Sequence, residues 1–304
     1  MDILVRRSNL LVSVADKDAV GNAWRHNADA ITLDLAGADA GARAGVRDAI
    51  ASAAQGAAEV FVRVSGAALR ADLEAAVWPG LRGIMLADVN SAAEIVAAAD
   101  AVSSLESARG IVAGSLQIIV VLATARGVWD VRSLVTASPR ISQVVLDEQA
   151  LAADMDIEPV PEHDPFVYAR GRVVVESIAA KVMPVGIAYP LSVQMHKAAP
   201  EEIRALAVKG RNLGMKGVLC PHPEWVGPVN AAFTPTPELV AYNKRVREAF
   251  AAGVAAGTAA VPLDGRMIDV PVDEWAIVVL ATAQACAARD AEKQAAVSAR
   301  QGRG

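Results

Sequence analysis

The stretch Gln117-Ile118-Ile119-Val120-Val121-Leu122 is apolar at every position after the glutamine, and most of these residues are β-branched. A strand with one face in water would alternate apolar and polar residues, whereas a strand buried on both faces is apolar throughout. The stretch therefore predicts one strand of a buried parallel sheet.

Seven further runs of this kind occur along the chain, at residues 9–14, 30–35, 59–64, 83–86, 143–146, 182–188 and 217–220. Amphipathic helical patterns lie between them, including residues 39–54, 91–101, 168–180 and 200–213. Eight strands joined by helical crossovers predict an α/β fold, a (β/α)₈ TIM barrel. Length alone, at roughly 150 residues per domain, would suggest two domains, but the pattern favours one barrel over residues 1–235.

The remaining residues, 236–304, are more chain than a barrel needs. A helical run from Pro237 to about Ala256 is followed by the turn-rich segment Val261–Pro271 and by a helix to roughly Ala299. This C-terminal extension could pack over the barrel mouth or onto a neighbouring copy. A helical hairpin without such a role fits the pattern equally well.

Composition excludes several classes of protein. The 304 residues carry 29 Lys and Arg against 34 Asp and Glu, a formal charge of −5, which argues against nucleic-acid binding. The longest uncharged stretch, Gly110–Ala125, is shorter than the roughly 18 apolar residues that a membrane span requires, so we expect no membrane segment. Cys220 and Cys286 are far apart and form no C-x-x-C motif, which fits a reducing cytoplasm.

Five stretches, in order, resemble the citrate lyase β-subunit-like and malyl-CoA lyase family of the aldolase/citrate lyase superfamily. They are residues 28–35, Phe61-Val62-Arg63-Val64, Thr124-Ala125-Arg126-Gly127-Val128, residues 214–223, and Leu263-Asp264-Gly265-Arg266-Met267-Ile268-Asp269-Val270-Pro271. The resemblance implies a barrel with a C-terminal lid, assembled as a homotrimer or homohexamer, in which each lid reaches over a neighbour's site. It also implies a carbon–carbon lyase that uses Mg²⁺ and acts on an acyl-CoA thioester or a dicarboxylate.

The family's metal ligands are missing from this sequence. Family members hold Mg²⁺ with a Glu and an Asp, and by the resemblance Ala123 and Ala150 stand at those two positions. Hard cations require oxygen ligands, and a methyl group supplies none. Neighbouring polar positions of the family site have changed as well, since this chain has Ser65 and Ala87-Asp88 there. We therefore expect no metal site, with a site relocated to Glu148 as the less favoured alternative.

The resemblance assigns roles to residues that this chain keeps. Arg63 would bind a substrate carboxylate beside Asp34, but a structural ion pair between the two is an alternative. Asp269 would be the general acid or base at a neighbouring copy's site, although it could instead cap the helix that follows it.

Two other retained positions would contact the substrate. His222, between two prolines, lies where the family holds CoA, and a loop histidine that satisfies backbone groups is the alternative. Arg126 begins a helix whose amides could meet an anion, although a tight strand-to-helix turn requires no ligand.

Two functions follow. The first is a lyase of the aldol or Claisen type on an acyl-CoA or a small oxo or hydroxy acid, with the metal-dependent chemistry altered or lost. The second is a catalytically inactive ligand-binding or partner subunit with the same fold.

Overall fold

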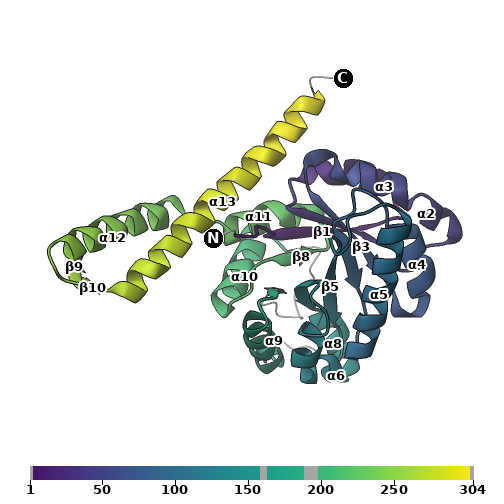
Figure 1. Ribbon diagram of the computed structural model, residues 1–304, viewed down its shortest axis with the longest axis horizontal. Helices are drawn as coiled ribbons and strands as arrows, with labels where there is room; N and C mark the ends of the chain where they lie inside the picture. The colour runs from purple at the N-terminus through teal and green to yellow at the C-terminus, as the bar shows by residue number, and fades with distance from the viewer. Residues whose placement is uncertain (1–2, 158–162, 188–197, 302–304) are drawn as a thin grey trace. The chain divides into compact units, whose positions relative to one another are not determined.

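The computed structural model describes residues 3–157, 163–187 and 198–301. Within them, parallel strands form one sheet in the order β7-β6-β5-β4-β3-β2-β1-β8 (Figure 1). Its two edges meet, because the Gly186 amide donates to the Gly217 carbonyl at 3.0 Å and the Lys216 amide donates to the Pro184 carbonyl at 2.9 Å. The predicted barrel is confirmed. The strands are β1 (Ser8–Ser13), β2 (Ala30–Asp34), β3 (Glu59–Val64), β4 (Gly83–Leu86), β5 (Gln117–Leu122), β6 (Ile141–Leu146), β7 (Met183–Val185) and β8 (Val218–Cys220).

Helices follow the strands along the chain. In this part of the molecule they are α1 (Lys17–Asn22), α2 (Ala40–Ala44), α3 (Val46–Ala53), α4 (Leu69–Ala76), α5 (Ala92–Ala108), α6 (Ala125–Trp129), α7 (Val131–Val135), α8 (Glu148–Asp154), α9 (Val167–Ala179), α10 (Pro200–Leu213) and α11 (Val226–Phe233).

Some boundaries differ from the prediction. The helix expected over residues 39–54 is divided at Gly45, whose amide bonds to Ala42 and Arg43 carbonyls in a turn. Helix α5 runs seven residues beyond Ala101. Ser103 and Ser104 do not interrupt it, because their hydroxyls donate hydrogen bonds to backbone carbonyls one turn earlier in the same helix. Strand β7 ends at Val185, and Ala188 of the predicted strand lies outside the described residues.

Alternation along the strands decides which side chains face the barrel interior. Ala30, Phe61 and Val121 belong to a cluster inside the barrel, whereas Ile31 and Leu33 belong to the larger cluster beneath the helices. Residues two positions apart share a face of a strand. Asp34, Arg63 and Ala123 are therefore on the interior face, at the carboxyl ends of their strands.

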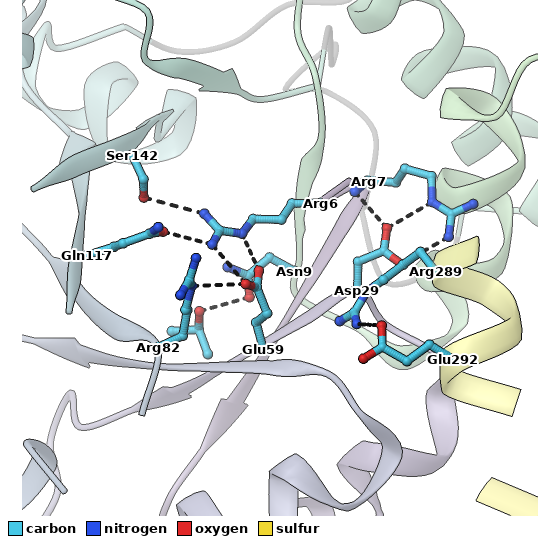
Figure 2. A network of polar contacts seen from close by, with 11 residues as sticks. Arg6, Arg7, Asn9, Asp29, Glu59, Arg82, Gln117, Ser142, Arg289 and Glu292 are labelled. Atoms are coloured by element: carbon cyan, nitrogen blue, oxygen red, sulfur yellow. Dashed lines mark hydrogen bonds and ion pairs between the residues drawn. The ribbon is translucent and has the colours of Figure 1, made fainter. Parts of the chain in front are cut away.

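The opposite end of the barrel is tied together by Arg6, which is 2% exposed. Its guanidinium donates to Gln117 Oε1 at 2.7 Å, to Glu59 Oε1 at 3.1 Å and to Ser142 Oγ at 3.4 Å (Figure 2). One side chain thus links the beginnings of β3, β5 and β6. In this fold the amino-terminal end serves stability, and the functional end is the other one.

A second compact unit comprises Thr234–Ala295 and residues 3–5. It contains α12 (Pro237–Ala255), β9 (Val261–Leu263), β10 (Arg266–Ile268) and most of α13 (Val270–Gln301). The two strands pair as an antiparallel hairpin around Asp264-Gly265, whose φ angles of 50° and 75° suit a two-residue turn. The segment predicted as turn-rich is thus an ordered hairpin, and its Asp-Gly pair is the sequence signal for it.

One described helix, Val270–Arg300, is long and apolar enough to cross a membrane when judged by length and composition. Only 22% of its most apolar 18-residue window is buried. The expectation of no membrane segment rested on uncharged runs alone, and length and composition by themselves do not overturn it. Asp273 and Glu274 on one side and Arg289 and Asp290 on the other limit the longest uncharged run of this helix to residues 275–288.

Candidate functional site

Asp34 and Arg63 lie side by side at the carboxyl ends of β2 and β3, where the strand register pairs them directly. Arg63 Nη1 donates to Asp34 Oδ2 at 3.1 Å, and the two side chains are 25% and 15% exposed. No second acceptor for Arg63 lies among the described residues. The ion pair considered from sequence therefore exists, and it leaves part of the guanidinium open to a ligand.

The side chains of Ala123 and Ala150 offer no ligand atoms for a metal ion. Ala123 is 6% exposed and directly follows β5. Ala150 lies in the first turn of α8, where its amide donates to Asp147 Oδ1 at 3.0 Å. Within the described ranges, no group of three or more His, Cys, Asp or Glu side chains is placed to hold a metal ion. The residues present do not fit a carboxylate-held Mg²⁺ at this place.

Glu148 is already committed to another partner. Both of its carboxylate oxygens bond to Arg170 of α9, with Nη2 to Oε2 at 2.6 Å, and Arg170 also donates to Asp164 at 2.5 Å. Burial raises the pKa of Glu148, and Arg170 only partly opposes this effect. Burial acts in the same direction on Asp164, but Arg170, the Phe166 amide and Lys209 together outweigh it and lower the pKa of that carboxyl. A metal held by Glu148 would have to break this buried pair, which argues against a relocated site.

Two backbone amides at the amino terminus of α6 already have hydrogen-bond acceptors within the chain. The Ala125 amide donates to Asp154 Oδ2 at 2.8 Å, and the Gly127 amide donates to Thr124 Oγ1 at 3.0 Å. Arg126 is 73% exposed and pairs with Asp130 one turn later. The turn is thus stable without a bound anion, and Arg126 extends into solvent.

His222 and Asp269 lie in local turns. His222 is partly buried, and its carbonyl accepts from the Trp225 amide at 3.1 Å as a short helical turn begins. Asp269 Oδ1 accepts from the Val272 amide at 3.3 Å, and its carbonyl accepts from the Asp273 amide at 3.0 Å. Asp269 therefore caps α13, as the alternative interpretation expected.

Sequence reasoning missed three residues around the site: Arg170, Asp154 and Asp72. Asp72 is fully buried, accepts from the Ser65 amide at 3.0 Å and pairs with Arg43 at 2.8 Å, so it links helix α2 to the residue that follows β3. A charged residue on the apolar face of a helix is a sequence signal for such pairs, and both Arg170 and Asp72 carry it. Asp154 gives no such signal, because its partner is a backbone amide.

Comparison with known proteins agrees with this architecture. The model of the family described as HpcH/HpaI aldolase/citrate lyase matches residues 7–223. The chain belongs to this family.

Its relatives are lyases by name. The citrate lyase subunit beta of Haemophilus influenzae is 25% identical over 92% of this chain and 97% of its own length. The L-malyl-CoA/beta-methylmalyl-CoA lyase of Cereibacter sphaeroides is 26% identical over 66% of this chain and 67% of its own length.

Solved structures share the fold. A citrate lyase from Burkholderia xenovorans has a TM-score of 0.74 at 17% identity, covering 96% of this chain and 97% of the other. A Mycobacterium tuberculosis protein in complex with magnesium, acetoacetate and coenzyme A has a TM-score of 0.69 at 19% identity, covering 92% and 98%. At these identities the similarity shows the fold alone.

Proposed function

We propose that this citrate lyase β-like protein binds an acyl-CoA thioester or a small oxo or hydroxy acid at the carboxyl ends of its barrel strands. The observation that carries the proposal is the Asp34–Arg63 pair, which holds a partly open guanidinium on the interior face where barrel enzymes bind substrates. A planar guanidinium suits bidentate contact with a carboxylate. Family membership and the names of the relatives support this ligand class.

The proposed chemistry is cleavage or formation of a carbon–carbon bond beside the thioester, altered from the family's usual form. With Ala123 and Ala150 in place of the ligands, no step can be assigned to Mg²⁺ here. A divalent cation balances two ligand carboxylates, whereas the carboxylate that this site keeps, that of Asp34, is already paired with Arg63.

Substrate binding and proton transfer would then be carried out by the chain's own side chains. Arg63 would hold the carboxylate of the oxo-acid fragment, with Asp34 keeping the guanidinium in place. Asp269 of a neighbouring copy would donate or accept the proton at the enolate carbon, provided that it comes within hydrogen-bond reach. Arg126 and His222 would contact the CoA portion, since Arg126 is largely exposed and its guanidinium suits phosphate.

The alternative is a subunit that binds a ligand or a partner without catalysis. It is favoured by the absence of both ligand carboxylates and by the ion pair that Glu148 already forms with Arg170. Turnover separates the two functions. Cleavage of malyl-CoA or citramalyl-CoA by the purified protein would support the lyase, and no turnover across a panel of CoA esters would support the subunit.

Assembly and location are part of the same proposal. We propose that residues 1–235 form the barrel domain, and that residues 236–304 form a lid that joins copies into a homotrimer or homohexamer. Trp275, Ile277 and Val278 of α13 are 59%, 44% and 37% exposed, and such apolar side chains are typical of a surface that another copy covers. Cys220 and Cys286 are both buried and are not joined in a disulfide, which supports a cytoplasmic location.

The binding proposal is tested by titrating oxaloacetate and acetyl-CoA into the protein in the presence of a chelator. We expect Arg63→Ala to weaken oxaloacetate binding at least tenfold, because a charge-assisted contact of about 1.5–3 kcal/mol is lost. Its unfolding free energy should change by only about 1 kcal/mol, since the pair is partly exposed. The matched control is Arg126→Ala, which should leave oxaloacetate binding unchanged while weakening acetyl-CoA binding. Equal oxaloacetate affinity in the wild type and Arg63→Ala would contradict the assignment.

A further inference from the structure

Two leucines on the inner face of the barrel are reached by solvent. Leu11 of β1 and Leu219 of β8 are partly exposed, although each lies between two buried residues of its strand. Leu10 and Val12 belong to the cluster beneath the helices, so alternation along β1 directs Leu11 inward. Leu219 packs against the cluster inside the barrel. We call Leu11 and Leu219 the leucine pair.

The leucine pair lies at the height of Arg63 in the barrel. In an eight-stranded barrel of this type, residues at one height differ from hydrogen-bonded partners by about one residue per strand. Arg63 is paired with Asp34, and Asp34 is paired with Ser13 of β1. The inward residue of β1 at the height of Arg63 is therefore Leu11, two positions before Ser13. The same stagger brings Leu219 of the next strand close to that height.

The charges at this end of the barrel leave room for one ligand carboxylate. Arg63 pairs with Asp34, and Asp147 directly follows β6. Within the described residues, Arg63 is the only cation on the inner face of the strands at the carboxyl end. A ligand with one carboxylate therefore has one partner there. A second carboxylate would lose water beside acidic side chains without gaining a cation.

Aliphatic side chains occupy the inner face on the other side of the ion pair. Val121 of β5 and Val145 of β6 belong to the inner cluster, and Ala87 and Ala123 directly follow β4 and β5 and are 4% and 6% exposed. The leucine pair provides aliphatic surface on β1 and β8, where solvent reaches it. An acid held at Arg63 thus has one charged contact and aliphatic surface beyond it.

We propose that the ligand of this site is an oxo or hydroxy acid with an unbranched aliphatic chain, whose carboxylate binds Arg63 and whose chain extends over the leucine pair. Arg63 and Leu11 are two strands apart, about 10 Å along the sheet, so a chain of several carbons spans them. The inference rests on the proposed function, which assigns the carboxylate to Arg63, and it adds the class of acid. Selectivity comes from burial of the chain, because each buried methylene strengthens binding about fourfold.

Titration calorimetry with unbranched α-oxo acids of four, six and eight carbons tests this class, with oxaloacetate for comparison and a chelator present. We expect each step of two methylenes to strengthen binding about tenfold, and oxaloacetate to bind more weakly than the six-carbon acid. Equal affinities along the series, each lost in Arg63→Ala, would overturn the inference and leave the proposed function standing. No Arg63-dependent binding of any of these acids would contradict the proposed function as well.

Substitution of the leucine pair shows whether the chain lies where the inference places it. Leu11→Gln should weaken binding of the eight-carbon acid about tenfold and leave the four-carbon acid unchanged, a split that general damage to the fold would not produce. Leu213→Gln is the matched control, because Leu213 is 46% exposed at the end of α10 and should have no effect. Equal dependence on chain length in the wild type and Leu11→Gln would contradict this placement.

A new cation in the leucine pair gives a test by gain of binding. Leu11→Lys should strengthen binding of α-oxoadipate about tenfold, because the ammonium supplies the partner that its second carboxylate lacks in the wild type. The same variant should weaken binding of the eight-carbon acid. Unchanged affinity of Leu11→Lys for both acids, with the variant folded by circular dichroism, would overturn the inference.

Discussion

At the scale of single residues, we propose that the family's site has lost its metal ligands and kept a residue that binds a carboxylate. By the resemblance to the family, Ala123 and Ala150 stand in place of two carboxylates, whereas Arg63 lies beside Asp34. This combination can be predicted from sequence, since it depends only on residue identities and strand order. The ion pair between Glu148 and Arg170 could not be predicted, because the packing of α9 against the end of β6 brings the two residues together.

Glu106 provides a test of the buried charges outside the site. Its carboxylate accepts from the Gly114 and Leu116 amides, each at 2.9 Å, and pairs with Arg140 at 2.6 Å. Burial alone would raise the pKa of Glu106, but these donors together lower it.

A lowered pKa in the folded state means that the ionised carboxylate stabilises the fold above the unfolded-state pKa, and that this contribution is lost as the pH falls through the folded-state pKa. We expect Glu106→Gln to cost about 3 kcal/mol near neutral pH. The difference from the wild type should shrink as the pH falls below about 4. Urea denaturation across pH measures both, and a pH-independent difference would contradict this account.

At the scale of elements, continuous apolar runs are sufficient to predict the strands, because a barrel strand is buried on both faces. Helix ends are harder to predict. The break between α2 and α3 at Gly45 and the extension of α5 past Ala101 depend on local hydrogen bonds that periodicity does not report. The Asp264-Gly265 hairpin has a clear sequence signal, but a turn-rich segment alone does not distinguish a hairpin from a loop.

Helix α13 tests the proposed assembly through the C-terminal extension. Trp275→Asp should reduce the mass of the assembly, because it places a charge on the exposed apolar side of this helix. Val112→Asp is the control, since Val112 is 75% exposed in the loop before β5 and should have no effect. An unchanged mass for Trp275→Asp would argue against α13 as an interface.

At the scale of the whole molecule, the structure comprises a family barrel and a second compact unit, and the chemistry depends on which carboxylates the barrel mouth retains. Fold and family follow from the order of the motifs. Substrate identity does not follow, because by the resemblance to the family the positions that would distinguish its substrates are those that differ here, among them Ser65, Ala87 and Ala123.

The most direct test of the central claim is Mg²⁺ binding measured by isothermal titration calorimetry. We expect no Mg²⁺ binding to the wild type and clear binding to the double variant Ala123→Glu/Ala150→Asp, which restores both carboxylates. The control Gln149→Glu/Ala153→Asp adds two carboxylates at exposed positions on the same helix and should remain without affinity. Mg²⁺ binding to the wild type that disappears in Glu148→Gln would contradict the account. It would show a metal site built on Glu148, which in this account is paired with Arg170.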